Sequence, residues 1–576
     1  MKRADVRVVT PVLLGLVAVS AIGLAAPDYW VFLSTSAAIN ALIALSVGVV
    51  YGRAGMVALC PMAFAGIGAW TTGWLNLHME LPFLLEMLLG ALAAVPVGVA
   101  IGLPALRLRG INLAVATLAF GGAVAVVVFD RGFPGANDQR PVVRPDVAHS
   151  TTGYFFLSVS VLAVAGLLLA RANRGRVGAG WMVVRDSERA TAALGHSVVT
   201  TKLLAFAVSA FLAGLGGALL SGQLGILSGV SFLPYASMVV FTAAVAFGAV
   251  HLEGAVLAGV AAVILPEILR QLALPQDIAA GLFAVAAIQA LAGGEGGIAG
   301  GLRAKFSRNT TTALVTAVPT RDAGAPTPAP QRARQATSEL RVRGVGVTYG
   351  TVRALDGVDL LVRAGTVHGL IGPNGAGKST LIDVISGFVV STNGEIHLEG
   401  KPVTGLSAHK RARRGIRRSF QQGRVSPSLT IFQYLALSSR GTVDHRLIGE
   451  LLDAFGCPPQ STTIGTLDVG TRRLVEVAAT LVSRPRVALL DEPAAGLAAE
   501  ESARLGSVIA ELPERFGCSV LLVEHDIEMV SACCDEITAL DFGRVIASGS
   551  PQAVLRDPAV MRAYLSGAAD AAEMVI

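Results

Sequence analysis

Apolar residues form long continuous runs in the first half of the chain and shorter runs in the second half. In the first half, ten runs are each roughly 17 to 25 residues long, the length that a helix needs to cross a bilayer. They lie at residues 8–26, 31–51, 56–76, 83–106, 111–129, 153–171, 203–223, 234–250, 252–270 and 276–292. This pattern predicts an α-helical, polytopic membrane domain of about ten helices within residues 1–305.

The first run raises the question of a cleaved leader. It follows Met1-Lys2-Arg3 and ends at Leu24-Ala25-Ala26, which is typical of a secretory signal peptide. A second long run begins almost at once, at Val31. We therefore interpret residues 8–26 as a retained membrane helix.

Basic residues between the runs indicate how the helices are oriented. They fall in alternate loops, which the positive-inside rule places in the cytoplasm. They are Arg53, Arg107, Arg109, Arg171, Arg174, Arg176, Arg185, Arg189 and Lys202. Arg270 breaks the pattern. An even number of spans predicts that the protein crosses the cytoplasmic (inner) membrane of the cell with both termini in the cytoplasm.

Composition agrees with a membrane protein, because 53% of the residues are hydrophobic and only 15% are charged. The net charge of +6 is modest, and no block of Lys and Arg interleaved with aromatic residues occurs, so we expect no nucleic-acid partner. The five cysteines show neither a metal-binding spacing nor a disulfide framework. The adjacent Cys533 and Cys534 could be redox-active, but packing in a reduced cytosolic domain is the favoured interpretation.

From residue 306 to 338 the hydrophobic periodicity stops, and prolines stand among alanine, threonine and arginine. This composition predicts a semi-extended, flexible linker. Patterns typical of a soluble α/β domain resume at Glu339. The sequence thus predicts a membrane domain at 1–305, a linker at 306–338 and a soluble domain at 339–576.

The soluble half contains a glycine-rich loop between an apolar run at 367–371 and a helix-like run at 381–385. The loop reads Gly372-Pro373-Asn374-Gly375-Ala376-Gly377-Lys378-Ser379-Thr380 and matches G-x-x-x-x-G-K-[ST]. Glycines let the backbone direct its N–H groups at phosphate oxygens, and the following helix adds the positive end of its dipole. Lys378 can reach the β- and γ-phosphates, and Ser379 can ligate Mg²⁺. We therefore predict a site for ATP and Mg²⁺.

Two further apolar runs end in residues suited to ATP hydrolysis. Residues 487–490 precede Asp491, an acid that can hold the metal, and Glu492, a base that can activate water. Residues 520–523 precede Glu524 and His525; His525 can reach the γ-phosphate or can be a structural loop residue.

Two single residues are weaker candidates. Gln421 follows the glycine-rich loop at a distance suited to touching both a Mg²⁺-bound water and the membrane half. Tyr349 ends an early predicted strand and could stack on adenine or be an exposed strand aromatic.

One predicted cytoplasmic loop stands out, because residues 181–194 have the pattern of a short amphipathic helix that Gly195 ends. One interpretation is an interfacial helix that lies on lipid headgroups. We favour a coupling helix that docks on the ATPase, because an ATP-binding domain in the same chain needs a mechanical contact with the membrane domain.

Several motifs of the first half resemble the membrane subunits of branched-chain amino-acid ABC importers. They are Y-G-R-A-G at 51–55, A-F-A-G-I-G-A at 63–69, L-R-L-R-G-I at 106–111, R-D-S-E at 185–188, A-A-L-G at 192–195 and K-L-L-A-F at 202–206. The likeness extends from about Ser36 to Leu302. It is broken at Cys60-Pro61-Met62, where the family has a Gly-His pair, and this departure leaves the exact substrate open.

Residues 339–567 resemble an ABC-type ATPase, and Ala494-Ala495-Gly496-Leu497 and Ala563-Tyr564-Leu565 are similar to the branched-chain importer ATPase. The resemblance implies adenine binding by Tyr349, Mg²⁺ binding by Ser379, Gln421 and Asp491, coupling through Gln421, and catalysis by Glu492 with His525 at the γ-phosphate. It also implies a head-to-tail ATPase dimer in which the signature loop of one chain completes the site of the other.

The signature loop departs from the family pattern. The family sequence L-S-G-G-Q is here Leu467-Asp468-Val469-Gly470-Thr471, which keeps Gly470 as a nucleotide-binding candidate but places Asp468 where the family has serine. Ala498 also replaces an aspartate of many ABC ATPases. Because a carboxylate repels phosphate, we expect a heteromer with one active and one weak ATP site.

These observations predict a fused permease–ATPase subunit for ATP-driven import of branched-chain or related apolar amino acids. Expected partners are a second permease subunit, a second ATPase subunit, an extracytoplasmic substrate-binding protein and membrane lipid. The alternatives are an ABC exporter half-transporter and an ATP-gated membrane receptor that does not transport. The direction of substrate flux in oriented vesicles distinguishes the exporter, and ATP turnover stimulated by a binding protein would exclude the receptor.

Overall fold

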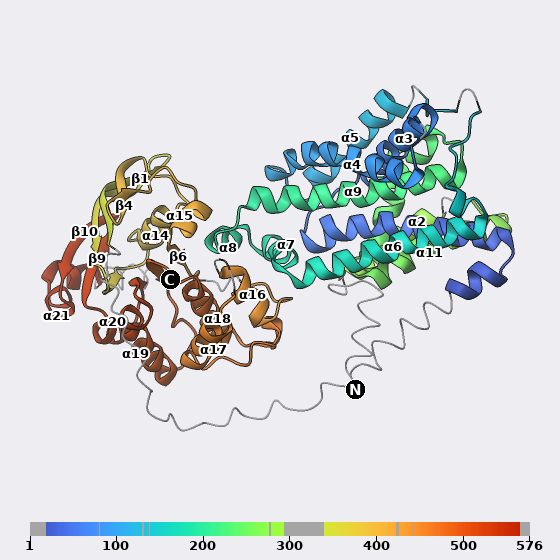
Figure 1. Cartoon of the computed structure of the whole chain (residues 1–576). Helices are drawn as coiled ribbons and strands as arrows, with labels where there is room; N and C mark the ends of the chain where they lie inside the picture. Colours follow the sequence, from blue (N-terminus) through green and yellow to red (C-terminus); the bar gives the residue numbers. More distant parts are fainter. Residues whose placement is uncertain are drawn as a thin grey trace. The chain divides into compact units, whose positions relative to one another are not determined.

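The computed structural model describes residues 19–79, 81–129, 132–136, 139–275, 278–292, 339–421, 425–439, 441 and 443–564. The chain forms two compact units (Figure 1). The helical unit contains residues 1–174 and 199–319, and the α/β unit contains residues 175–198 and 320–576. A short segment that lies between two helices of the helical unit in the sequence therefore folds as part of the α/β unit.

The helical unit is built from apolar helices that follow the predicted runs. They are α2 (Asp28–Val47), α3 (Pro61–Met79), α4 (Phe83–Gly102), α5 (Ile111–Val124), α6 (Thr151–Arg174), α9 (Val198–Leu224), α10 (Pro234–Phe247), α11 (Leu252–Gln271) and α12 (Ile278–Ala292). Two π-helices extend α2 and α5, at Gly48–Arg53 and Ala125–Phe129. Each of the predicted runs after the first overlaps one of these helices; the first, 8–26, lies largely outside the described residues.

Six helical segments in the described part of the chain are long and apolar enough to cross a membrane: Asp28–Arg53, Phe83–Gly102, Ile111–Phe129, Thr151–Arg174, Val198–Leu224 and Leu252–Gln271. Helices α10 and α12 are apolar but shorter. The second half of α3 contains Thr71, Thr72, Asn76 and His78, which lower its hydropathy. The predicted count of about ten membrane helices is therefore not confirmed.

Glycines allow helices of this unit to pack with their backbones in contact. A Cβ at Gly68 of α3 would lie 2.2 Å from the carbonyl oxygen of Gly214 of α9, and a Cβ at Gly217 would lie 1.8 Å from that of Ala65. Only glycine fits at such positions, and small residues are the usual means by which membrane helices approach closely. Helix α9 is therefore held tightly against α3.

The α/β unit contains two sheets. The antiparallel sheet has the order β2-β1-β4-β5, with β1 (Leu340–Tyr349), β2 (Val352–Val362), β4 (Asn393–Leu398) and β5 (Lys401–Pro402). The second sheet has the order β10-β9-β3-β8-β7-β6, with β3 (Val367–Ile371), β6 (Ile416–Arg418), β7 (Val487–Asp491), β8 (Ser519–Val523), β9 (Glu536–Asp541) and β10 (Arg544–Gly549). Its strands pair in parallel except β10, which is antiparallel to β9.

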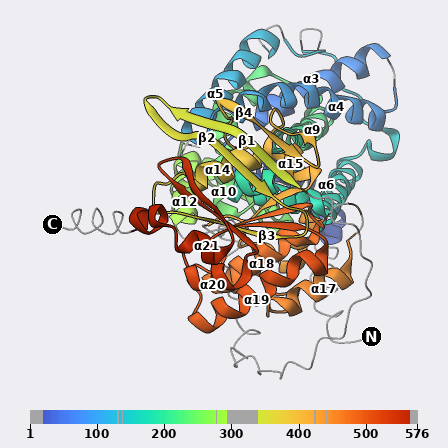
Figure 2. The ribbon, with the colours of Figure 1, turned by 90° about the vertical axis from the view of Figure 1, so that its left-hand side faces the viewer.

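Alternating side chains of the six-stranded sheet pack into two cores, because successive residues of a strand point to opposite faces. Leu489 and Leu521 join the core shared with the antiparallel sheet and α14 (Lys378–Ser386). Leu490 and Leu522 join the core on the other face, with α18 (Val469–Val482), α19 (Ala499–Phe516) and α20 (Ile527–Cys533). Figure 2 shows the yellow antiparallel strands and the orange to red helices on opposite sides of this sheet. Further helices of this unit are α15 (Ala408–Arg414), α16 (Ile431–Ser438), α17 (His445–Ala454) and α21 (Pro551–Leu555).

The segment 175–198 forms two helices rather than the single one expected from residues 181–194. They are α7 (Arg176–Asp186) and α8 (Glu188–Ala193). The break falls at Ser187, whose backbone is extended and whose hydroxyl accepts the N–H of Ala190 at 3.1 Å, so that a serine cap starts a new helix. As predicted, Gly195 follows the last turn, and its positive φ of 82° suits glycine.

Candidate functional site: a phosphate loop facing an acidic pair

The glycine-rich loop joins β3 to α14 in the α/β unit, as predicted. Gly377 adopts a left-handed conformation before the first residue of α14, and a Cβ there would lie 2.8 Å from the carbonyl oxygen of Ala354 in β2. This close approach explains the need for glycine. Asn374, Gly375 and Ser379 are exposed and Thr380 is half-buried, so the turn and the helix start are open to a ligand.

Lys378, the first residue of α14, folds back across this loop. Its Nζ donates hydrogen bonds to the carbonyl oxygens of Gly372 at 2.7 Å and Pro373 at 2.9 Å. Burial lowers the pKa of Lys378, while the nearby carboxylates of Glu492 and Asp491 act in the opposite direction. The ammonium group is thus placed at the mouth of a loop of backbone N–H groups, an arrangement that fits the phosphates of a nucleotide.

Asp491 and Glu492 come directly after each other at the end of β7 but lie in different environments. Asp491 is buried, and Arg418 Nη2 donates to its Oδ2 at 2.9 Å. Burial raises the pKa of Asp491, and the Arg418 guanidinium opposes that rise. Glu492 has a φ of 49°, an uncommon value for a residue with a side chain, and its N–H donates to the carbonyl oxygen of Val523 at 2.9 Å. The Glu492 side chain is 14% exposed, against 5% for Asp491.

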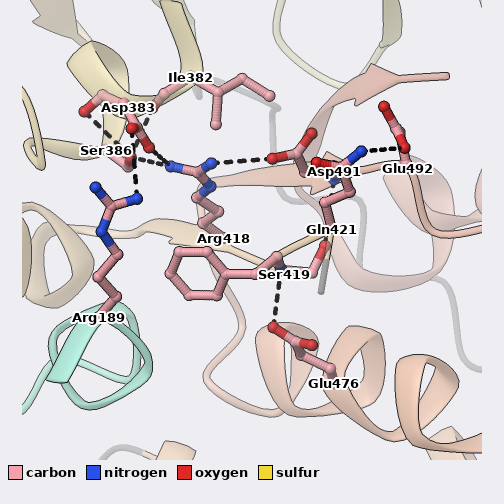
Figure 3. A network of polar contacts seen from close by, with 11 residues as sticks. Arg189, Ile382, Asp383, Ser386, Arg418, Ser419, Gln421, Glu476, Asp491 and Glu492 are labelled. Carbon is pink, nitrogen blue, oxygen red and sulfur yellow. Dashed lines mark hydrogen bonds and ion pairs between the residues drawn. The ribbon is translucent and has the colours of Figure 1, made fainter. Parts of the chain in front are cut away.

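Gln421 and His525 converge on Glu492, as Figure 3 shows for Gln421. Gln421 Nε2 donates to Oε2 of Glu492 at 2.7 Å, and His525 Nε2 lies 2.9 Å from Oε1. The two residues come from separate elements, since Gln421 follows β6 and His525 follows β8. The structure therefore brings together three side chains that the sequence singled out separately.

The predicted metal ligands are oxygen donors. Asp491 supplies a carboxylate at the end of β7, Ser379 supplies a hydroxyl at the start of α14, and Gln421 supplies an amide oxygen. Oxygen donors suit Mg²⁺, which is commonly held by one or two carboxylates together with substrate phosphates and water. No group of three or more His, Cys, Asp or Glu residues capable of holding a metal occurs among the described residues. The donor set thus fits Mg²⁺ bound together with a nucleotide.

Tyr349 and Gly470 come from other elements of the α/β unit than the three side chains joined at Glu492. Tyr349 ends β1 at the turn into β2, and its side chain is half-exposed. Gly470 is buried in the first turn of α18, behind Asp468, which caps that helix. Oδ1 of Asp468 accepts the N–H of Thr471 at 2.8 Å, and its Oδ2 accepts the Thr471 hydroxyl at 2.5 Å. These bonds lower the pKa of Asp468.

Helix α18 also holds the segment around Gln421, through residues that no motif indicated. Oε1 of Glu476 accepts the N–H of Phe420 at 2.8 Å (Figure 3), and Arg473 Nη2 donates to the carbonyl oxygen of Gln421 at 2.7 Å. Arg473 also donates to the carbonyl oxygen of Ala495, in the loop after Glu492. A helix that begins at the signature loop is therefore bonded to the backbone at Gln421 and to the loop that follows Glu492.

A tyrosine from the end of the described chain reaches the phosphate loop. The N–H of Gly372 donates to the hydroxyl of Tyr564 at 3.0 Å. The sequence marked Tyr564 only as part of a family-like ending, and nothing in its local pattern indicated this contact. Tyr564 holds the first glycine of the loop from outside the motif.

Residues 175–198 dock on the α/β unit through polar and apolar contacts. Arg413 Nε donates to the carbonyl oxygen of Gly195 at 2.8 Å, and Arg417 Nη1 donates to that of Ala193 at 3.0 Å. His196 Nε2 lies 2.9 Å from the carbonyl oxygen of Leu437, and the Ser426 hydroxyl bonds to Asp186. Four buried side chains of the segment join the core on the α18 face: Ala179, Val183, Ala190 and Leu194.

The helical unit has a small pocket of its own. It is lined by residues of α2, the following π-helix, α3 and α9, with the Tyr51 and Ser209 side chains among apolar ones. Cys60, where the sequence departs from the family pattern, also lines it. Residues 55–60 are not helical, and such backbone is tolerated within membrane proteins where it is buried or lines a cavity.

Comparison with known protein families assigns both units. Residues 29–291 match the permease component of the branched-chain amino acid transport system. Residues 355–495 match the ABC transporter family, and residues 544–565 match the branched-chain amino acid ATP-binding cassette transporter family. The last match includes Tyr564.

Curated relatives cover the α/β unit. The chain is 34% identical over 250 residues to a high-affinity branched-chain amino acid transport ATP-binding protein of Pseudomonas aeruginosa, covering 40% of this chain and 98% of that protein. It is 32% identical over 250 residues to the protein of the same description from Escherichia coli, with the same shares covered. It is also 34% identical over 226 residues to a ribose import ATP-binding protein of Pseudomonas putida, covering 38% of this chain and 44% of that protein.

These matches agree with the geometry, because the phosphate loop, the acids and the signature helix lie within the matched ranges. ATP-binding cassettes of this kind bind nucleotide and hydrolyse ATP. The chain therefore belongs to the branched-chain amino acid family of ABC transporters, with a permease component and an ATP-hydrolysing component joined in one membrane polypeptide.

Proposed function

We propose that this chain imports branched-chain or related apolar amino acids across the cytoplasmic membrane, driven by ATP hydrolysis. The match of residues 29–291 to a branched-chain amino acid permease component supports this substrate class. The ATPase half alone would not, because it is also similar to a ribose import protein.

The observation that carries the proposal is the docking of residues 175–198. This segment is continuous in sequence with α6 and α9 of the helical unit, yet its side chains pack in the core of the α/β unit. A rearrangement of the ATPase would therefore act directly on the chain that leads into two membrane helices. Such a segment provides the mechanical link that ATP-driven transport needs.

Each site residue has a proposed role. Backbone N–H groups of Asn374, Gly375, Gly377 and Thr380 cradle the phosphates, Lys378 pairs with the β- and γ-phosphates, and Tyr349 stacks on adenine.

Ser379, Asp491 and Gln421 hold Mg²⁺ directly or through water, and the metal neutralises charge on the phosphates when bound. Gly470 contributes to the ATP site of a partner ATPase.

Glu492 is the proposed general base. Its carboxylate takes a proton from the attacking water, and its two oxygens are fixed by Gln421 and His525. Each oxygen of an ionised carboxylate can accept two hydrogen bonds, so the attacking water can bind beside these partners or in exchange for one of them. Both partners are exposed side chains on loops, so the exchange needs no change in the sheet. In this proposal Gln421 responds to the nucleotide bound at the site, and His525 contacts the γ-phosphate.

We infer further that the working transporter is a heteromer. The charged Asp468 would face the phosphates bound by a partner chain, whereas the phosphate loop and acids of this chain are intact. A second ATPase subunit with a serine signature would give one active and one weak site. A second permease subunit and an extracytoplasmic substrate-binding protein complete the proposed assembly.

The proposed arrangement along the chain is a membrane domain at 1–305, a linker at 306–338 and an ATPase domain at 339–576, with both termini in the cytoplasm. The docked segment 175–198 supports this orientation, because a loop that joins α6 to α9 in the sequence folds as part of the ATPase unit. Accessibility of single cysteines introduced in the loops after α2 and α4 would check it.

Uptake assays test the function. The chain, purified with its partners from native membranes and reconstituted in proteoliposomes, should take up radiolabelled leucine, isoleucine or valine only with ATP on the cytoplasmic side. ATP-dependent loss of preloaded substrate would instead favour an exporter. ATP turnover without flux in either direction, for any apolar amino acid, would contradict transport.

A further inference from the structure

Arg418 lies buried between two carboxylates of the α/β unit, as Figure 3 shows. Its Nη2 donates to Oδ2 of Asp491 at 2.9 Å, and its Nη1 pairs with Asp383 of α14 and donates to the Ser386 hydroxyl at 3.2 Å. The side chains of Arg418 and Asp491 are each only 5% exposed. The guanidinium also stacks on the ring of Phe420, 4.8 Å from its centroid.

A second arginine shares Asp383 with Arg418. Arg189 of the docked helix α8 places Nη1 3.5 Å from Oδ2 of Asp383, and its guanidinium lies 5.6 Å from the ring centroid of Phe388. Its side chain is 46% exposed. Charges of alternating sign thus run from Arg189 through Asp383 and Arg418 to Asp491.

This row joins the docked segment to the carboxylate that we assigned to Mg²⁺. Arg418 and a divalent cation both require the charge of Asp491, and cations near each other repel. When Asp491 binds the metal, its ion pair with Arg418 weakens and Arg418 pairs more strongly with Asp383. The pairing of Asp383 with Arg189 weakens as a result. A change at either end therefore alters the bond at the other end, and such coupling is reciprocal.

We propose that Arg418 is a positioning residue that links occupancy of Asp491 to the hold of Asp383 on Arg189. This inference rests on the proposed role of Asp491 in Mg²⁺ binding. It gives the ATPase a second route to the docked segment, separate from Gln421. The route consists of side chains of this chain alone and needs no partner subunit.

The direction in which each substitution should change Mg²⁺ binding follows from the competition of Asp383 and Asp491 for Arg418. Without Arg189, Asp383 holds Arg418 more strongly, and Asp491 is freer for the metal. Without the charge of Asp383, Arg418 is left to Asp491 alone, and the metal competes less well. The two substitutions should therefore change Mg²⁺ binding in opposite directions, which a purely structural role would not do.

The test compares dissociation constants of a non-hydrolysable ATP analogue, measured on the purified full chain with Mg²⁺ and with a chelator. The ratio of the chelator value to the Mg²⁺ value reports metal binding without any turnover. Arg189→Met should raise this ratio about two- to fivefold, the range expected from a half-exposed ion pair. The matched control is Arg176→Met, because Arg176 belongs to the docked segment but bonds to the Ser439 hydroxyl.

Asp383→Asn should lower the ratio, and Arg189→Met should then have no further effect. An unchanged ratio in Arg189→Met, or the same change with and without Asp383→Asn, would overturn the proposal. Should Asp383→Asn fail to fold, Arg189→Met against Arg176→Met decides alone. Asp491→Asn distinguishes the failure of the metal assignment from the failure of the link through Arg418. If nucleotide binding by Asp491→Asn still depends on Mg²⁺, the metal assignment is wrong. If that dependence is lost but Arg189→Met has no effect on the ratio, only the link through Arg418 is wrong.

Discussion

Two regions of the α/β unit are bonded in different ways. At the hydrolytic centre, Glu492 is held by the side chains of Gln421 and His525, both exposed and both on loops. At the docked segment, Arg413 and Arg417 bond to the backbone carbonyl oxygens of Gly195 and Ala193, and apolar side chains are buried alongside.

The difference matches two tasks. Side-chain partners can be exchanged when a ligand arrives, whereas a bond to a backbone carbonyl fixes where the helix end lies. The hydrolytic centre is therefore suited to chemistry that changes partners, and the docked segment is suited to moving as one body. Substitutions at the hydrolytic centre should change the rate of ATP hydrolysis. Substitutions at the docked segment should change the amount of substrate transported per ATP hydrolysed.

The largest effect should come from removing the base. Glu492→Gln keeps the shape and can still bond to its neighbours, but it cannot take a proton from water. ATP should still bind, while turnover should fall roughly 100-fold or more. Glu500→Gln, in the exposed first turn of α19, is the matched control and should keep turnover. Full turnover in Glu492→Gln, in an assembly without another competent site, would refute the assignment.

A smaller effect should come from the signature loop. Because hydrogen bonds from Thr471 lower the pKa of Asp468, its carboxylate stays charged at working pH. Exposure and salt reduce its repulsion of phosphate to about 1.4 kcal/mol, which is about tenfold in affinity. Asp468→Ser keeps a helix cap and should tighten nucleotide binding at the weak site of the heteromer by that factor. Asp468→Asn should do the same; unchanged binding in both would exclude charge as the cause.

The phosphate loop offers a milder test, because Tyr564 supports it from outside the motif. Tyr564→Phe removes the acceptor of the Gly372 N–H, and a single neutral hydrogen bond contributes about 0.5–1.5 kcal/mol. ATP affinity should fall about threefold in equilibrium binding measurements. Tyr349→Phe keeps the ring that would stack on adenine and should bind ATP normally. Equal losses in the two variants would show that Tyr564 has no special role.

The smallest effect concerns pH at the docked segment. Burial lowers the pKa of His196, and Arg417, Arg413 and Arg176 lower it further, against the Leu437 carbonyl. A histidine whose folded pKa is lowered contributes stability above its unfolded pKa of about 6.5 and loses it as the pH falls. From pH 7 to pH 6, unfolding of the α/β unit should become easier by about 0.5 kcal/mol from this group. His196→Gln should remove that part of the pH dependence in denaturant titrations. If the wild type and His196→Gln show the same pH dependence, the His196 ring is not buried in its neutral form.

Local patterns predicted the parts of the site that are continuous in sequence. The phosphate loop, Asp491 with Glu492, and His525 each follow a buried strand, and the structure places them at the ends of β3, β7 and β8. Long apolar runs likewise predicted the apolar helices of the helical unit. In both cases a short stretch of sequence contains the whole physical cause.

Contacts between distant residues could not be predicted in this way. Arg418 and Asp491 are 73 residues apart, and Arg417 and Ala193 are 224 apart, so no window of sequence contains either pair. The break between α7 and α8 was also missed, because the amphipathic pattern continues across Ser187 while its hydroxyl starts a new helix. The assignment of Asp491 to the metal was therefore easier than the identification of Arg418, the arginine that holds it.

The central claim is that residues 175–198 couple hydrolysis to transport, and the number of substrate molecules taken up per ATP hydrolysed tests it most directly. In proteoliposomes of the complete transporter, Arg413→Ala should lower this ratio about two- to fivefold while hydrolysis continues, because Gly195 loses a charged donor. Arg414→Ala, one residue further along α15, removes a bond to the carbonyl oxygen of Pro402 in β5 at 3.2 Å rather than a bond to the docked segment, and it should leave the ratio unchanged. Equal ratios in the wild type and both variants would contradict coupling through this segment.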